Sequence, residues 1–86
     1  MTKYYLATVQ DRHADPENRL FSTPEKALAF ANLVLHEESE RAHYDSEDAV
    51  VMTKEQLKRA GLMFFQTYSC EGDYVQVKEL TLDDAV

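Results

Sequence analysis

Two histidines and a carboxylate recur at helical spacing in the middle of the chain, and such side chains can bind a transition metal. His36, Glu40 and His43 lie four and three residues apart, so a helix would project all three from one side. Glu40 and His43 also have the Glu-x-x-His spacing of carboxylate-bridged metal sites. Those sites take further ligands from neighbouring helices, and the chain has no second copy of the motif. We treat these residues as weak candidates and predict no metal and no cofactor.

Groups that could support covalent or phosphate chemistry are few. Cys70 is the only cysteine, and we expect it in a tight turn, where no helix N-terminus would activate the thiol. The chain has no Gly-x-Ser-x-Gly motif, and its two glycines are too few for a glycine-rich phosphate loop. Its many carboxylates fall on polar segments rather than on the apolar ones that would tune a catalytic acid. We therefore predict no catalytic residues and a protein that is not an enzyme.

A run of acidic residues dominates the formal net charge of −7. Within this run Arg41 is the only basic residue. Like charges repel one another, so the fold keeps such a run in water or presents it to a cationic partner. The scattered lysines and arginines disfavour direct binding to nucleic acid. The predicted partner-binding residues are Glu37, Glu38, Glu40, Asp45, Glu47 and Asp48.

Length and composition indicate one small domain. Eighty-six residues leave no room for a second lobe, and we expect a single domain over 1–82 followed by a frayed acidic tail, 83–86. The apolar stretches are far shorter than the roughly 20 residues that cross a bilayer, and no secretory leader is recognisable. With one cysteine and no disulfide, these features predict a cytoplasmic protein that does not bind membranes.

The clearest local structure is a helix that begins at or just before Pro24. The segment from Ser22 to Glu25 has capping-box spacing with Ser22 as the cap; it fits equally with Thr23 as the cap and Pro24 at the first helical position. Apolar residues then recur on one broad stripe, and the helix is expected to reach about Ala42. The stripe consists of Ala27, Leu28, Phe30, Ala31, Val34 and Leu35.

Strand patterns flank the helical region on both sides. Lys3 to Gln10 alternates with apolar groups on both sides, which favours a central strand, and Arg19 to Phe21 fits a short returning strand. Leu62 to Ser69 and Tyr74 to Leu80 fit a hairpin whose turn uses the positive φ that Gly72 allows. Because the first of these strands starts with four apolar residues, we expect it to be buried on both faces there.

A short helix is expected between the long helix and the hairpin. Thr53 and Gln56 have capping-box spacing, and Gly61 is suited to end a two-turn helix. The preceding run from Ala49 to Met52 fits either a strand or a buried connector. Together these elements predict an α+β domain of order ββ-α-α-ββ, with a four-stranded antiparallel sheet covered by the long helix and a short helix.

We predict a small acidic protein-binding module that docks its acidic run on a basic surface of a partner protein. Its size, acidity and lack of catalytic motifs are similar to those of phage and mobile-element inhibitors, a likeness of composition and not of motif. Phe64 and Phe65 must point to opposite faces of one strand, so a homodimer formed through the sheet is a further hypothesis. Two alternatives stay open: an accessory or structural subunit that uses a sheet edge or apolar face, and a small ligand- or metal-binding protein with its site at a homodimer interface.

Overall fold

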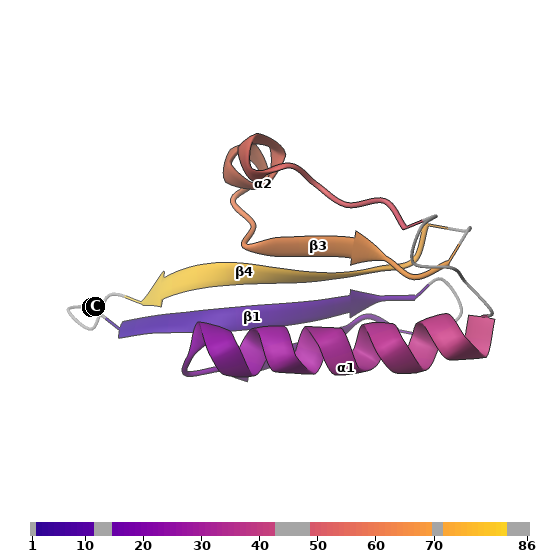
Figure 1. Ribbon diagram of the computed structural model, residues 1–86. Helices are drawn as coiled ribbons and strands as arrows, with labels where there is room; N and C mark the ends of the chain where they lie inside the picture. Colours follow the sequence, from indigo (N-terminus) through magenta and orange to yellow (C-terminus); the bar gives the residue numbers. More distant parts are fainter. Residues whose placement is uncertain (1, 12–14, 43–48, 70–71, 83–86) are drawn as a thin grey trace.

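A computed structural model describes residues 2–11, 15–42, 49–69 and 72–82. Strands and helices follow the order β1, β2, α1, α2, β3, β4 (Figure 1). Their bounds are β1 Thr2–Gln10, β2 Glu17–Phe21, α1 Pro24–Ala42, α2 Lys54–Ala60, β3 Phe64–Thr67 and β4 Tyr74–Leu82. This order, together with a single antiparallel sheet, confirms the predicted α+β fold.

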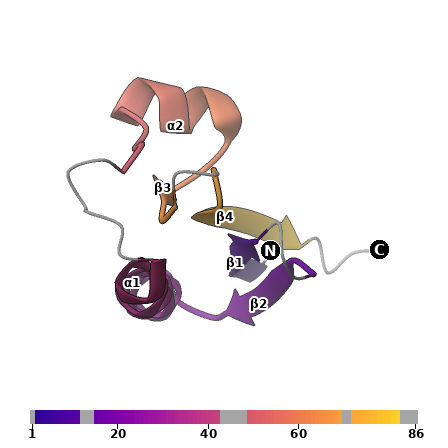
Figure 2. The ribbon, with the colours of Figure 1, turned by 90° about the vertical axis from the view of Figure 1, so that its right-hand side faces the viewer.

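The sheet has the strand order β2-β1-β4-β3, which places the two long strands side by side at its centre (Figure 2). Tyr5 pairs with Phe21 of β2 and with Glu79 of β4, and the same antiparallel register continues along β1. The prediction that β1 is a central strand is therefore confirmed. Its alternation explains why: Ala7 and Val9 enter the core, while Leu6 and Thr8 point to the other face.

The core lies between α1 and one face of the sheet. Val75 and Val77 of β4 are fully buried there, and the small residues Ala27 and Ala31 let α1 approach the strands closely. At the helix N-terminus the backbone N–H of Lys26 donates to the Thr23 hydroxyl over 3.3 Å. Thr23 is therefore the cap and Pro24 the first helical residue, the second of the two predicted arrangements.

The short helix α2 has the predicted capping box and C-terminal glycine. Thr53 accepts from the backbone N–H of Gln56, whose side chain accepts in turn from the backbone N–H of Thr53. Gly61 ends the helix with a φ of +70°. α2 stands next to β3, away from α1 (Figure 2). The segment before it is neither the strand nor the buried connector that the sequence suggested, because Val50 and Val51 are 60% and 59% exposed. It pairs with β3 through the bridge between Val51 and Gln66.

Element ends differ from the sequence-based expectation in three places. β2 begins at Glu17, two residues before the expected start. β3 is shorter than expected, and Met63 is 37% exposed, so the prediction of burial on both faces is wrong at that residue. β4 continues through Leu82 because its last residues pair with the start of β1. The predicted tail, 83–86, lies outside the described residues.

Candidate acidic docking surface

The last turns of α1 carry the described part of the predicted partner-binding surface. Glu37 and Glu40 are exposed there, whereas the Glu38 side chain is only 23% exposed. The helix positions Glu38 toward the sheet because it continues the apolar stripe of α1. The remaining predicted residues and one candidate metal ligand lie outside the described residues: Asp45, Glu47, Asp48 and His43.

One ion pair and one histidine–carboxylate contact lie at this helix end. Arg41 Nη1 lies 3.3 Å from Glu38 Oε1, and His36 Nε2 lies 3.3 Å from Glu40 Oε1. The Glu40 and His36 side chains are both largely exposed, so this pair contributes little to stability. Among the described residues of α1, Glu37 has no ion pair within 4 Å, which leaves its charge for a partner.

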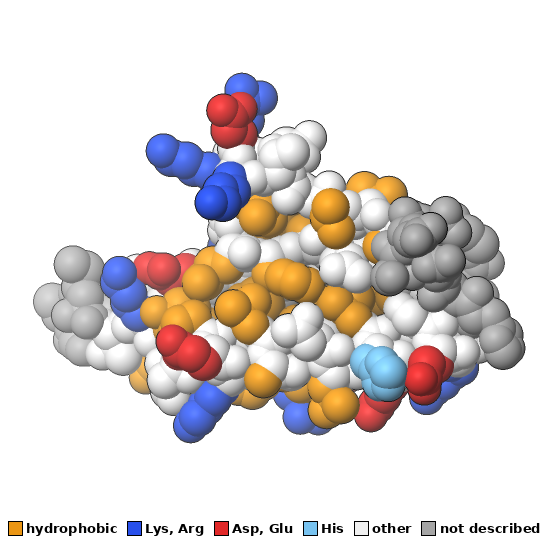
Figure 3. Space-filling view, in the orientation of Figure 1, with side chains coloured by type: hydrophobic (Ala, Val, Ile, Leu, Met, Phe, Trp, Pro, Cys, Tyr) orange, Lys and Arg blue, Asp and Glu red, His pale blue; other side chains and the backbone are white. Residues whose placement is uncertain are grey.

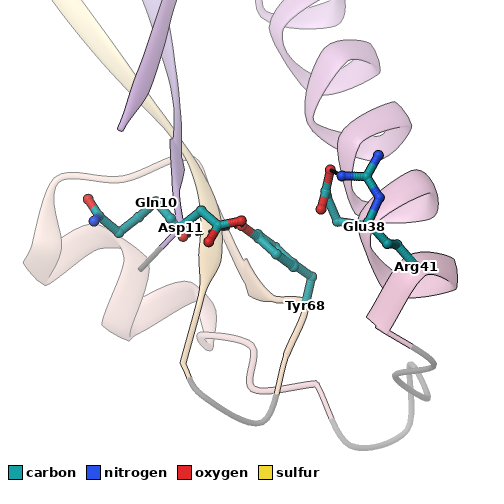
Figure 4. A network of polar contacts seen from close by, with 5 residues as sticks. All are labelled: Gln10, Asp11, Glu38, Arg41 and Tyr68. Carbon is teal, nitrogen blue, oxygen red and sulfur yellow. Dashed lines mark hydrogen bonds and ion pairs between the residues drawn. The ribbon is translucent and has the colours of Figure 1, made fainter. Parts of the chain in front are cut away.

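Strand ends bring two further carboxylates to the same end of the molecule. The Tyr68 side chain, 2% exposed, donates its hydroxyl to Asp11 Oδ2 over 3.2 Å, and Gln10 O lies 3.4 Å from the same hydroxyl (Figure 4). Asp73 accepts from the Ser69 hydroxyl over 2.9 Å. Asp11 follows β1 and Asp73 precedes β4, so the antiparallel pairing of these two strands places both carboxylates at the same end of the sheet.

The carboxylates around Tyr68 act on its hydroxyl group. Burial first, and then the negative charges of Asp11, Asp73 and Glu38, raise the pKa of Tyr68 above its ordinary value of about 10. Glu38 comes from α1 and the two aspartates from the sheet, so carboxylates of both layers lie at this end of the molecule (Figure 4). We name Asp11, Glu37, Glu38, Glu40 and Asp73 the acidic end; the first and last of these were not predicted.

Sequence reasoning missed Asp11 and Asp73 because neither belongs to a run of charge. The pairing of β1 with β4 would have found them, since Gln10 is opposite Tyr74 and the residues just beyond that pair must be neighbours. Strand alternation predicted both strands but not that they pair with each other. The proximity of these two carboxylates therefore follows from the register of strand pairing, and the local composition does not reveal it.

The metal candidates are only partly described. His36 and Glu40 are close to each other, but the residues that the structure describes contain no group of three His, Cys, Asp or Glu side chains placed to hold a metal ion. His36 is exposed, and Figure 3 shows histidine and acidic side chains next to one another on the surface of α1. Searched over the same residues, no helix is both long and apolar enough to cross a membrane. No protein-family model, curated protein or solved structure matches this chain.

Proposed function

We propose that this protein is a small non-enzymatic binding module that docks its acidic end on a basic surface of a partner protein, in the manner of an inhibitor or modulator. The proposal includes the acidic residues of the run that lie outside the described part of the chain. The partner-binding residues are then Glu37, Glu38, Glu40, Asp45, Glu47 and Asp48.

The observation that carries this proposal is the convergence of carboxylates from three separate segments. The end of β1, the start of β4 and the last turns of α1 each bring an acidic side chain to the same end of the molecule. Negative groups gathered on one end produce a directional field that attracts a basic partner and orients it.

Helix electrostatics support the same conclusion. The C-terminal end of a helix carries a partial negative charge, so an acidic side chain in the last turn of α1 is unfavourable by roughly 0.3–1 kcal/mol. Glu40 occupies this turn, and Arg41 is its only basic residue. Helix stability therefore does not account for Glu40 in this turn, and this placement supports a role for Glu40 in binding.

A capture experiment tests the proposal. The chain, immobilised through its N-terminus, is exposed to a lysate of its native host at low salt, and bound proteins are identified and quantified by mass spectrometry. We expect a specific basic partner that is released steeply as salt rises, since screening weakens contacts between exposed charges. The double variant Glu37→Gln/Glu40→Gln should reduce its capture at least about tenfold.

A variant of equal net charge provides the control. Glu25→Gln/Glu55→Gln removes two exposed carboxylates from the first turns of α1 and α2, away from the acidic end. This control should capture the partner almost as well as the unmodified chain. If both double variants lose it equally, only the net charge matters and a docking surface is excluded. Capture that is insensitive to salt would also contradict the proposal.

A second candidate function, an accessory subunit of a larger assembly, is favoured by an apolar groove. α2, the connector before it and β3 surround a groove of about 600 Å³, and the Val50 and Val51 side chains are largely exposed there. The groove is lined by Val50, Val51, Met52, Gln56, Arg59, Ala60 and Phe65. In that case Val51→Asp, and not Glu37→Gln/Glu40→Gln, should abolish capture, and binding should persist at high salt.

A further inference from the structure

The groove between α2 and β3, which we name the α2 groove, has one wall that is fixed to the sheet. The backbone N–H of Thr67 donates to Val50 O over 3.1 Å, and the Thr67 hydroxyl accepts from the backbone N–H of Val50 over 2.8 Å. The Phe65 ring lies against Tyr74, with 5.0 Å between the ring centroids. α2 forms the opposite wall and buries none of its own residues (Figure 2).

The lining of the α2 groove is apolar except for two hydrogen-bond donors on α2. Gln56 and Arg59 are three residues apart, so they share the side of the helix that lines the groove. The capping box uses Gln56 Oε1 as the acceptor of the Thr53 backbone N–H over 2.9 Å, so the amide nitrogen of the same side chain remains a donor. None of the residues that line the groove is acidic.

The Arg59 guanidinium has no carboxylate partner within the described part of the chain. Glu55 lies one turn earlier on α2 and does not pair with it. Two exposed lysines of the same helix, Lys54 and Lys58, add positive charge, and Figure 3 shows these basic side chains around α2 with apolar side chains below them. In a chain of net charge −7, α2 therefore provides a local cationic site beside an apolar surface.

The size of the α2 groove fits a small molecule. Seven residues line it, whereas a stable protein interface takes about 20–30 residues from each side. Its volume of about 600 Å³ lies within the range of roughly 300–1,000 Å³ that small-ligand sites have. Such sites are mostly apolar, with a few polar groups that fix the orientation of the ligand, and this description matches the lining of the α2 groove.

We propose that the α2 groove binds a small aliphatic carboxylate. Its carboxylate group accepts hydrogen bonds from the Arg59 guanidinium and the Gln56 amide, and its hydrocarbon chain lies against Val51, Met52 and Phe65. Charge complementarity selects this occupant, because a guanidinium binds a carboxylate through two parallel hydrogen bonds, whereas a neutral hydrocarbon would cover both donors without pairing them. This site is separate from the acidic end and does not depend on the docking proposed there.

Titration of the unmodified chain with decanoate, followed by backbone amide NMR shifts, tests this proposal. We expect saturable shifts at Val51, Gln56 and Phe65, with a dissociation constant of roughly 0.1–1 mM for a ligand of about 12 non-hydrogen atoms. Octanoate, which is two methylene groups shorter, should bind about four- to fifteenfold more weakly, because each buried methylene contributes about two- to fourfold in affinity.

Two variants of equal net charge separate a specific contact from a general attraction. Arg59→Gln should weaken decanoate binding about tenfold, because it removes the bidentate contact. The matched control Lys58→Gln removes the same charge from an exposed residue of α2 outside the lining, and should change the affinity by less than about twofold. Octanol, the uncharged counterpart of octanoate, should bind the unmodified chain at least about fivefold more weakly than octanoate does, and both should bind Arg59→Gln alike.

The absence of saturable shifts up to about 10 mM decanoate would overturn the proposal. So would equal losses of affinity in Arg59→Gln and Lys58→Gln, octanol that binds as well as octanoate, or decanoate shifts that are centred outside the α2 groove. An acidic amphipathic peptide that shifts Val51 and Phe65 while decanoate does not would also overturn it, and would assign the groove to a partner protein. None of these results bears on capture through the acidic end, so the two proposals fail independently.

Discussion

The buried hydroxyl of Tyr68 offers the sharpest test of the acidic end. Tyr68→Phe removes one hydroxyl and leaves the ring, which is 2% exposed, in place. The lost hydrogen bond joins the hydroxyl to the Asp11 carboxylate over 3.2 Å. A hydrogen bond to a charged group contributes about 1.5–3 kcal/mol, and Asp11 can recover part of it from water because it is only half-buried. We therefore expect the free energy of unfolding at pH 7 to fall by about 1–1.5 kcal/mol.

At high pH, Tyr68→Phe should become more stable than the unmodified chain. The folded state holds the Tyr68 proton more tightly than the unfolded state, because burial and then the neighbouring carboxylates raise its pKa above the ordinary value of about 10. Its contribution to stability is complete below pH 10 and is lost as the pH rises above it, by up to about 1.4 kcal/mol per pH unit. The phenylalanine variant lacks this loss, so its stability should equal that of the unmodified chain near pH 11 and exceed it beyond.

Urea denaturation followed by far-UV circular dichroism, at intervals from pH 7 to about pH 11.5, measures both effects. The difference between the two curves is the informative quantity, because contributions that the two proteins share cancel in it. Parallel curves for Tyr68→Phe and the unmodified chain would refute the idea that carboxylates converge on this hydroxyl.

Two other substitutions separate the core from its periphery. Val77→Ala, at a fully buried residue, should lower the free energy of unfolding by about 2 kcal/mol, whereas Val50→Ala, at a residue that is 60% exposed, should lower it by less than about 0.5 kcal/mol in the same urea titration. Thr53→Ala removes the capping box of α2 and should destabilise that helix by about 1 kcal/mol. Because α2 buries none of its residues, the loss should appear as faster amide exchange in α2 with an almost unchanged global midpoint; an equal fall of the midpoint would show that α2 unfolds together with the sheet.

Local patterns predicted the elements because each depends on neighbouring residues. The alternation around Ala7 identifies a central strand, and the Thr53 and Gln56 pair identifies a helix start, whatever the rest of the chain does. The local pattern fits both Ser22 and Thr23 as the cap of α1. The hydrogen bond from Lys26 decides it, and that bond depends on how the chain enters the helix from β2.

Features that depend on pairing between distant strands were less accessible. Thr81 lies beyond the expected end of the last strand at Leu80, yet it is a strand residue because Lys3 pairs with it. The acidic end has the same origin, since it requires the β1–β4 register. Alternation predicts which residues of one strand share a face of the sheet. Only the pairing register shows which residues of two neighbouring strands lie on the same face. The convergence of Asp11 with Glu38 needed, in addition, the position of α1 on the sheet.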